Sequence, residues 1–379
     1  MPTFKTPVAV GGTPRPPAHR SAQGRSDCPP SRETACARVE AAGRSALRRG
    51  VLAVGLLLAA SASAQSGTAA AEFLNIPIGA RATAMGGAFG ATASDGAALY
   101  WNPAGLAGMR GAQASFEYAQ WYVGSDVNFA SVASPTPFGV VAVGVTALTY
   151  GDMDLIEEDV NRQQPTGETF SAGSYAVSLG VGRQLTDRFS LGGTVKVVRE
   201  QIANSAATGV AFDIGTLFVT PFQGVRLGAS IANFGPKMQM SGSDLNIPFD
   251  PLPGQSGNNN SVPGRIATDG YDLPLTMRVG LATELYQSAG TRVTVAVDAL
   301  SPSAAGQHVN VGAEVGLLGG LVQARGGVQE LFMDESTRSF TVGGGLRYAF
   351  GGLDLAADYA YEAAEYFDGV HRLSVGLRF

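Results

Sequence analysis

The feature that most restricts the fold of this chain is an alternation of apolar with small or polar residues, with a period of two, from residue 111 to the end. In the final segment one face carries Leu373, Val375, Leu377 and Phe379, while small and charged residues occupy the other. A period of two places successive side chains on opposite faces of a strand, whereas a helix has a period of 3.6. Residues 111–379 are therefore expected to be all-β.

Fourteen segments show this alternation, and many of them are about ten residues long. They lie near residues 112–123, 127–134, 139–149, 174–183, 188–199, 209–220, 225–233, 275–286, 291–300, 308–317, 321–329, 339–350, 353–362 and 371–379. Strands of soluble proteins usually have ~5–6 residues, whereas a tilted strand that crosses a bilayer needs ~9–11. The segment lengths therefore favour strands that span a membrane.

The connections between these segments alternate in length. Short turns are expected at 184–187, 221–224, 287–290, 318–320 and 351–352, and longer connections at 150–173, 200–208, 234–274, 301–307, 330–338 and 363–370. Only the first hairpin, near Ser125, is short where a longer loop is expected. Outer-membrane barrels have short periplasmic turns and long extracellular loops. The pattern predicts a transmembrane antiparallel up-and-down β-barrel of about 14 strands, with both ends of the barrel in the periplasm. The alternating apolar residues that end in Phe379 are typical of an outer-membrane insertion signal.

Charged residues fall on the face opposite the large apolar side chains. Because Arg or Lys facing lipid at mid-membrane costs ~2–4 kcal/mol, these charges are expected to face the lumen, where opposite signs can pair. The predicted lumenal charges are Glu117, Lys196, Asp213, Arg226, Arg278, Glu284, Asp298, Glu314, Arg325, Arg347, Asp354, Asp358 and Arg378. The alternative is a soluble barrel or sandwich with the apolar face as its core, which strand length and loop pattern disfavour.

The N-terminal region indicates export. Residues 41–64 have the form of a secretory signal peptide, with basic residues before a ten-residue apolar run and the small residues Ala62-Ser63-Ala64 at its end. The mature chain is expected to begin at Gln65. Residues 1–40 are rich in Pro, Arg and Ser and contain both cysteines. We interpret them as a non-native or disordered leader, with translation starting nearer Arg44.

The charge balance excludes some functions. The first 64 residues hold nine of the 26 basic residues and three of the 31 acidic ones, so the rest of the chain has a net charge of −11. Nucleic acid is therefore not an expected partner, since its binding depends on cationic residues. The mature chain has no cysteine, which excludes zinc-thiolate sites and cysteine nucleophiles.

Residues 65–110 do not alternate like strands and are rich in small and turn-forming residues. Ser94 or Asp95 is expected to cap a short helix that runs from Ala97 to Trp101 and ends before Pro103. The side chains of a barrel of about fourteen strands need not fill its lumen. We therefore expect this segment to fold back into the lumen as a hatch.

Two stretches of this segment, residues 71–89 and 95–106, resemble the start of mature proteins of the PorV/PorQ family, which is related to the FadL long-chain fatty-acid transporters. The residues that make up the hatch motif are Gly86, Gly87, Asp95, Trp101, Asn102, Pro103, Ala104 and Gly105. The resemblance implies a fourteen-stranded barrel with an N-terminal hatch. It also implies one of two roles, because some members serve type IX secretion whereas FadL-like relatives pass hydrophobic molecules past the hatch to a lateral opening.

We therefore expect a non-enzymatic transport or accessory protein of the bacterial outer membrane, acting in type IX-like protein secretion. The alternative is a FadL-like channel for the uptake or export of hydrophobic small molecules such as long-chain fatty acids. The expected partners are outer-membrane lipid with either secreted cargo and secretion-machinery subunits or a hydrophobic ligand, and no cofactor or metal is expected.

Other candidate sites are weaker. The histidines His308 and His371 fit no metal-binding spacing, and an outer-membrane hydrolase would require His371 within hydrogen-bond reach of Ser374. The acidic run from Asp152 to Asp159 is compatible with calcium, although a solvated loop is favoured. The long connection 234–274 is the best candidate for an outer gate or a cargo contact, since long loops are often functional.

Overall fold

The computed structural model describes residues 69–379 apart from 157–164, 252–260, 334, 335 and 337. The described residues belong to one compact unit, Ser63–Phe379. The expected leader (1–40) and signal peptide (41–64) lie outside the described residues, and so do Glu157, Glu158 and Asp159 of the acidic run.

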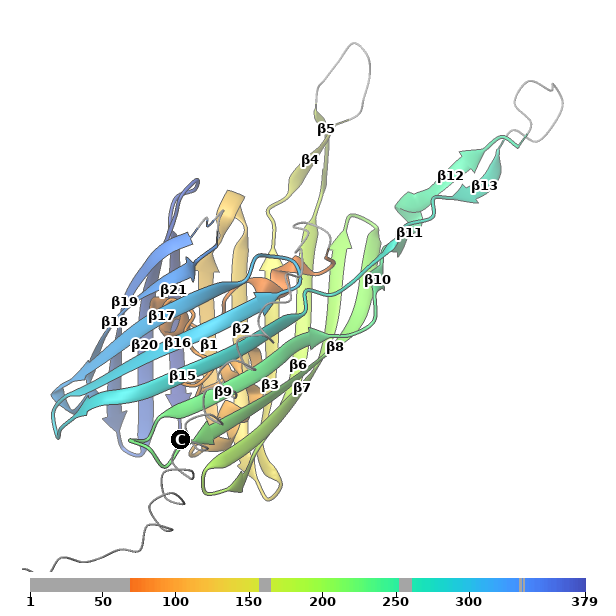
Figure 1. Ribbon diagram of the computed structural model, residues 1–379. Coiled ribbons are helices and arrows are strands. Elements are labelled where there is room, and N and C mark those ends of the chain that lie inside the picture. The colour runs from red at the N-terminus through yellow and green to blue at the C-terminus, as the bar shows by residue number, and fades with distance from the viewer. Residues whose placement is uncertain (1–68, 157–164, 252–260, 334–335, 337) are drawn as a thin grey trace, which may run out of the picture. The chain divides into compact units, whose positions relative to one another are not determined.

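Fourteen strands form a closed antiparallel barrel in which each strand pairs with its neighbours in the chain order (Figure 1). They are β1 (Gln113–Gln120), β2 (Asp126–Thr136), β3 (Gly139–Thr149), β6 (Ala172–Thr186), β7 (Phe189–Ile202), β8 (Ser205–Val219), β9 (Arg226–Phe234), β15 (Thr276–Gln287), β16 (Arg292–Pro302), β17 (His308–Leu317), β18 (Val322–Leu331), β19 (Arg338–Phe350), β20 (Leu353–Ala364) and β21 (Val370–Arg378). The first and last of these, β1 and β21, pair along their whole length from Gln113↔Arg378 to Gln120↔His371 and close the barrel. The predicted fold class, an up-and-down barrel of fourteen strands, is confirmed.

One end of the barrel carries only short connections, and we call it the turn end. Its connections are residues 137–138, 187–188, 220–225, 288–291, 318–321 and 351–352, with the 3-10 turn η5 (Leu318–Gly320) in the fifth. The opposite loop end carries two projecting hairpins, β4 (Met153–Ile156) with β5 (Pro165–Phe170) and β12 (Asn246–Phe249) with β13 (Val262–Arg265). It also carries the short strands β10 (Met238–Gln239), β11 (Ser241–Gly242) and β14 (Gly270–Tyr271) and the 3-10 turns η3 (Tyr122–Gly124) and η4 (Ser243–Leu245).

The prediction of a long connection at residues 200–208 is wrong. Strands β7 and β8 continue toward each other, and only residues 203–204 join them. Ala203 has a positive φ of 47°, which permits the tight turn. The sequence hid the beginning of β8 because its outward side chains there, Ala206 and Thr208, are too small or polar to show an apolar alternation.

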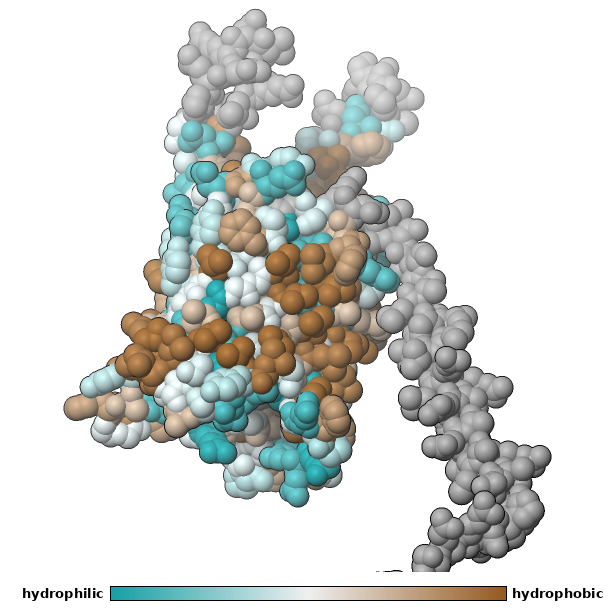
Figure 2. Space-filling view, turned by 60° about the vertical axis from the view of Figure 1, so that its left-hand side comes forward, coloured by the Kyte–Doolittle hydropathy of each residue, from teal (hydrophilic) through white to brown (hydrophobic). Residues whose placement is uncertain are grey.

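The outer face of the barrel is apolar. Large apolar side chains there are 40–60% exposed, among them Val132, Val177, Leu179, Ile214, Val279, Leu346, Leu355, Leu373 and Val375. Figure 2 shows such residues gathered in a band over the strands, with hydrophilic residues toward both ends. A continuous apolar surface of this extent is unfavourable in water and is expected of a wall that contacts lipid.

Residues 69–110, which we call the N-terminal segment, contain four short helical turns. These are η1 (Glu72–Asn75), α2 (Ala80–Ala84), α3 (Ala98–Trp101) and η2 (Pro103–Gly108). The expected helix is present as α3, and the carboxylate of Asp95 accepts a hydrogen bond from Ala97 N (3.1 Å) just before it. The helix α2 was not expected. Within the described residues, no helix is long and apolar enough to cross a membrane.

Candidate functional site

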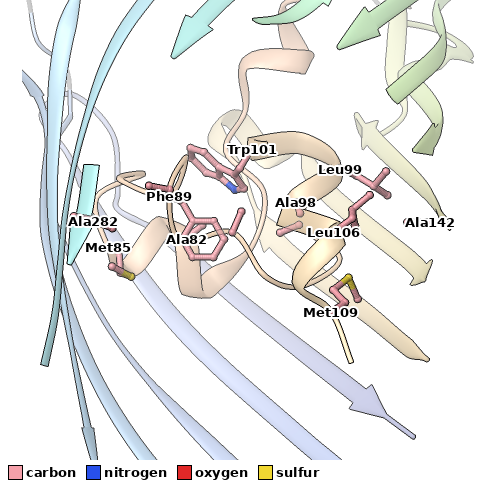
Figure 3. Close-up of a cluster of buried hydrophobic side chains, with 14 of the residues drawn as sticks. Ala82, Met85, Phe89, Ala98, Leu99, Trp101, Leu106, Met109, Ala142 and Ala282 are labelled. Atoms are coloured by element: carbon pink, nitrogen blue, oxygen red, sulfur yellow. The ribbon is translucent and has the colours of Figure 1, made fainter. Parts of the chain in front are cut away.

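The N-terminal segment packs against the inner wall of the barrel. Its buried side chains form one cluster with small wall residues such as Ala142, Ala282 and Ala296, and the members from the segment include Met85, Phe89, Leu99, Trp101 and Leu106 (Figure 3). The rings of Phe89 and Trp101 meet edge to face with centroids 6.0 Å apart. On the loop side, Phe73, Leu74, Ile76 and Ile78 form a second cluster with inward residues of β1, β2, β3 and β6–β8. The segment and the wall therefore share a hydrophobic core inside the barrel.

The Asn102–Gly105 turn lies on glycines of three neighbouring strands. Gly182, Gly192 and Gly215 of β6, β7 and β8 are paired across the sheet. A Cβ atom at Gly192 would overlap the backbone of Pro103, and one at Gly215 would overlap the Asn102 side chain. Glycine is thus required on this part of the wall for the turn to approach the strand backbones.

Asn102 is fully buried, and both the nitrogen and the oxygen of its side-chain amide form hydrogen bonds. Its Nδ2 donates to Gly90 O (2.8 Å) and to Thr216 O on β8 (3.0 Å), while its Oδ1 accepts from Ala104 N (3.1 Å). Asn102 therefore both caps η2 and ties two parts of the segment to the wall. These contacts attach the Asn-Pro-Ala-Gly turn to the wall.

The two adjacent glycines of the motif allow the segment to come close to the wall at a second place. Gly86 and Gly87 have positive φ values of 65° and 71°, a conformation that glycine adopts without strain. The N–H of Gly86 donates to Thr341 Oγ1 (2.9 Å), and that hydroxyl donates to Ala84 O (3.2 Å). The motif glycines thus bring the segment close to the β17–β19 part of the wall.

Charged wall residues bind the backbone of the segment. Asp298 Oδ2 accepts from Phe89 N (3.0 Å) and Gly90 N (2.7 Å), and Arg278 Nη1 donates to Trp101 O (2.7 Å). Asp298 is also 3.9 Å from Arg278 Nε. Lumenal charges here act as fixed partners for backbone groups of the segment, so the charges and the segment form one unit.

A second charged group lies toward the loop end, and the sequence reasoning missed most of it. Arg372 is fully buried between Glu117 (3.4 Å) and Glu362 (3.5 Å), and its Nη1 donates to Pro77 O (2.8 Å). Arg338 lies 3.4 Å from Glu362. Glu117 was among the predicted lumenal charges. Arg372 and Glu362 occupy inward positions in the same alternation, which would have identified them.

The other predicted lumenal charges are brought together in four groups. Lys196 pairs with Asp213 (2.7 Å) and donates to Asn233 Oδ1 (2.8 Å). The remaining pairs lie toward the turn end: Arg325 with Glu314 (2.8 Å) and Asp358 (2.7 Å), Arg347 with Asp358 (2.9 Å), Arg226 with Glu284 (3.8 Å), and Arg378 with Asp354.

Burial perturbs the titrating groups of the segment. It raises the pKa of Asp95 above its ordinary value, although the Arg81 guanidinium 3.8 Å away acts in the opposite direction. Burial also raises the pKa of Tyr100. For Arg81 burial acts against the charged form, but the Glu314 carboxylate at 2.8 Å outweighs it and the pKa is raised.

A cavity of about 250 Å³, which we call the upper cavity, lies between the N-terminal segment and the loop end. Its lining combines apolar side chains (Leu74, Tyr100, Trp101 and Leu300) and polar ones (Asn233 and Gln329) with the charged residues Glu72, Lys196, Arg278, Glu330 and Arg338. The Gln329 side chain is buried, and its Nε2 has no hydrogen-bond partner among the described residues. Within the part of the chain that the structure describes, this donor is therefore unpaired and enclosed in the wall beside the cavity.

The wall beside this cavity is interrupted. Within the described residues, Ala207–Ala211 of β8 pair with β7 on one side but with no strand on the other. The reason is that β9, after a bulge at Ala232 and Asn233, pairs once more through Phe234 with Phe212 and then ends. Five residues correspond to ~17 Å of strand edge. Met238 and Leu273 cover this wall break, and both are almost completely buried. Met238 packs against Gly209 on the lumenal face of β8.

His371 and Ser374 do not form the arrangement that a hydrolase would require of them. His371 faces outward, where its Nδ1 is 2.8 Å from Tyr359 Oη, whereas Ser374 is three positions away on the inward face of the same strand. His308 contacts the backbone oxygen of Gly306 (2.9 Å). Within the described ranges, no three His, Asp or Glu residues are grouped to hold a metal ion.

No protein-family model and no curated protein matches the chain. Among solved structures, the toluene transporter TodX of Pseudomonas putida aligns over 79% of this chain and 96% of its own, with 13% identity and a TM-score of 0.50. The monoaromatic hydrocarbon channel CymD aligns over 80% and 96% (12% identity, TM-score 0.49), and a FadL homologue of Pseudomonas aeruginosa aligns over 77% and 95% (12% identity, TM-score 0.44).

The fold is therefore similar to that of the toluene transporter TodX. At this level of identity the similarity concerns the fold alone. These three matches give no support specific to the PorV/PorQ family or to type IX secretion.

Proposed function

We propose that this protein is a non-enzymatic outer-membrane channel for small hydrophobic molecules, with residues 69–110 as its hatch. The observation that carries the proposal is the wall break beside the upper cavity, which Met238 and Leu273 cover. A molecule that enters from the loop end would reach the upper cavity above the segment. It would leave sideways through the break into the membrane, without crossing the packed segment.

The size of the upper cavity favours a small ligand. Its volume of about 250 Å³ exceeds the ~150 Å³ of an engineered apolar cavity that accepts benzene, but it lies just below the ~300–1,000 Å³ usual for drug-sized ligands. The proposed class is therefore compact hydrophobic molecules. A long acyl chain would require displacement of part of the N-terminal segment.

The outer membrane is the proposed location. The apolar outer face supports it, and the proposed signal peptide at 41–64, with cleavage after Ala64, would deliver the chain there. By the usual orientation of such barrels, the turn end faces the periplasm and the loop end faces the exterior.

A disulfide lock tests the route. Met238 Cγ lies 2.5 Å from the position that a Cβ of Gly209 would occupy, so Gly209→Cys with Met238→Cys places two thiols within bridging distance. The mature chain has no other cysteine. We expect the oxidised double variant to lose uptake of a labelled monoaromatic hydrocarbon by whole cells, and a reductant to restore it. Unchanged uptake in the oxidised protein would contradict the lateral route, and the single cysteine variants are the controls.

A second candidate is a PorV/PorQ-type accessory protein in secretion. It is favoured by the hatch motif and by exposed apolar residues at the loop end, including Ile247, Phe249, Phe332, Tyr366 and Phe367. Its test is the set of proteins on the cell surface after deletion of the gene. Loss of exported proteins that the wild type restores, but Ile247→Ser with Phe249→Ser does not, would support this candidate over the channel.

A further inference from the structure

A second cavity, which we call the lower cavity, lies at the turn end and has a volume of about 480 Å³. Residues Arg81, Thr92 and Ser94 of the N-terminal segment line one side of it, and residues 288–291 and 319–320 of two connections line the other. Among the described residues it shares no lining residue with the upper cavity. The two cavities are therefore separate sites on opposite sides of the segment.

The lower cavity is rich in arginine. Its lining includes Arg81, Arg226, Arg292, Arg325, Arg347 and Arg378, but only two carboxylates, Glu284 and Glu314. The chain beyond residue 64 has a net charge of −11, so composition does not explain this excess of cations. Three further carboxylates, Asp95, Asp354 and Asp358, pair with these arginines from outside the lining.

Part of the arginine group has a structural role. Arg325 is almost completely buried between Glu314 and Asp358, at 2.8 and 2.7 Å. Arg81 also donates to Glu314 (2.8 Å) and fixes α2 to the wall. Arg292 shares Glu314 (3.2 Å), and Arg347 shares Asp358 (2.9 Å). With Asp95 beside Arg81, three carboxylates therefore serve four guanidinium groups. The cluster around Glu314 therefore keeps an unbalanced positive charge beside the cavity.

Two arginines of the lower cavity, Arg226 and Arg292, are less closely paired with carboxylates. Arg226 lies 3.8 Å from Glu284, which is too long for a hydrogen bond, and its side chain is 27% exposed. The Arg292 side chain is 46% exposed and has only its share of Glu314. They come from different strands, β9 and β16, and both line the cavity. Each has N–H donors left for a ligand, since a guanidinium carries five.

We propose that the lower cavity binds a phosphate-bearing anion from the periplasmic side. Guanidinium forks match the oxygen geometry of phosphate, and their bonds to it are charge-assisted. A phosphate group presents several oxygens in different directions, so it can accept from Arg226 and Arg292 together. A carboxylate has only two oxygens to share between the two guanidinium groups, so phosphate can accept more hydrogen bonds from them. The cavity is larger than phosphate alone and leaves room for a glycerol group.

The anion has two sources, a soluble phosphate ester and the headgroup of a phospholipid at the periplasmic rim. The test uses the mature protein in a lipid-free, non-ionic detergent. One arm measures binding of sn-glycerol 3-phosphate by calorimetry, and the other measures retention of added phosphatidylglycerol by native mass spectrometry. Binding in the first arm identifies the soluble ester, whereas retention in the second arm alone identifies the lipid headgroup.

Variants of the lining residues show whether the anion binds in the lower cavity. Arg226→Gln with Arg292→Gln should weaken binding by at least roughly tenfold, because each removes a charge-assisted bond. Glu284→Gln should strengthen binding, since it removes a competing carboxylate. Arg188→Gln, in an exposed turn at the same end and outside the cavity, is the matched control and should bind like wild type.

If the double variant does not fold, Arg226→Gln alone gives the test, because that side chain has no hydrogen-bonded carboxylate to leave behind. Binding that is absent in both arms, or equal in wild type and the arginine variants, would overturn the proposal. Neither result would bear on the upper cavity, so this proposal and the proposed channel function fail separately.

Discussion

Asp298 is the wall residue whose replacement should release the N-terminal segment most selectively. Its side chain on β16 is completely buried, and one oxygen accepts hydrogen bonds from Phe89 N and Gly90 N. It is also the carboxylate beside Arg278, whose guanidinium donates to Trp101 O. Asp298→Ala removes two hydrogen bonds between the wall and the segment, together with the ion pair to Arg278 within the wall. It leaves the strand pairing of the backbone intact.

The expected cost follows from these contacts. Each buried N–H that loses its acceptor costs ~1–3 kcal/mol, and breaking a buried ion pair costs ~3–5 kcal/mol. The ion pair joins two wall residues, so its loss affects the docked and undocked states alike. The two N–H groups therefore set the loss in docking free energy at about 2–6 kcal/mol. This corresponds to a roughly 30- to 10⁴-fold smaller ratio of docked to undocked segment.

Trypsin cleavage after Arg81 is a suitable assay. Arg81 is held between Glu314 and Asp95 in the lumen, so cleavage there requires the segment to leave the wall. The Asp298→Ala protein in detergent should be cut faster by a factor that approaches the change in the docking ratio. Asp354→Asn is the control, since that carboxylate pairs with exposed Arg378 and should cost at most ~1 kcal/mol.

Equal cleavage rates in wild type and Asp298→Ala, with both barrels folded by circular dichroism, would refute this reasoning. The segment would then be held by its apolar contacts, and the hydrogen bonds to Asp298 would add little. Asp298→Asn distinguishes the contribution of the negative charge from that of the hydrogen-bond acceptor. Its amide oxygen can still accept hydrogen bonds, whereas the negative charge beside Arg278 is lost.

Three further predictions concern the same interface. Gly192→Val should displace the turn at Pro103 and raise protease access to the segment, whereas Gly108→Ala, with no atom within 4 Å of the new Cβ, should behave like wild type in the same digestion. Trp101→Phe should lower the free energy of unfolding in urea by ~1–3 kcal/mol, because a buried backbone carbonyl loses its 2.6 Å indole donor; an unchanged midpoint would count against that bond. Burial raises the pKa of Asp95 above its ordinary 3.8, so wild type should gain stability relative to Asp95→Asn as the pH falls from that raised pKa toward 3.8. Parallel stability curves for the two proteins across this range would show that Asp95 is not destabilised by burial.

The strands were predictable because lipid on one side and a lumen on the other impose a strict alternation. For example, β19 is observed at 338–350 and was expected at 339–350. The prediction failed at the start of β8, where small outward residues give no apolar signal. It also missed α2, whose alanines are compatible with helix or turn until packing against β19 and β20 decides.

The site was harder to derive from the sequence. Alternation could place Asp298 on the lumenal face, but not show that its partners are backbone N–H groups of a segment 208 residues away. Likewise, the wall break depends on where β9 ends, and a bulge at Ala232 and Asn233 leaves no periodic signal. Such features arise from the register between strands, which residue pattern alone does not specify.

Native mass spectrometry of the protein purified from its own outer membrane in mild detergent tests the central proposal most directly, since it detects bound small molecules and co-purifying proteins together. The channel proposal predicts a compact hydrophobic ligand that is displaced when a bulky side chain, as in Ala232→Trp, fills the upper cavity next to the wall break. A protein without such a ligand, carrying secretion subunits or exported cargo in stoichiometric amounts, would contradict it.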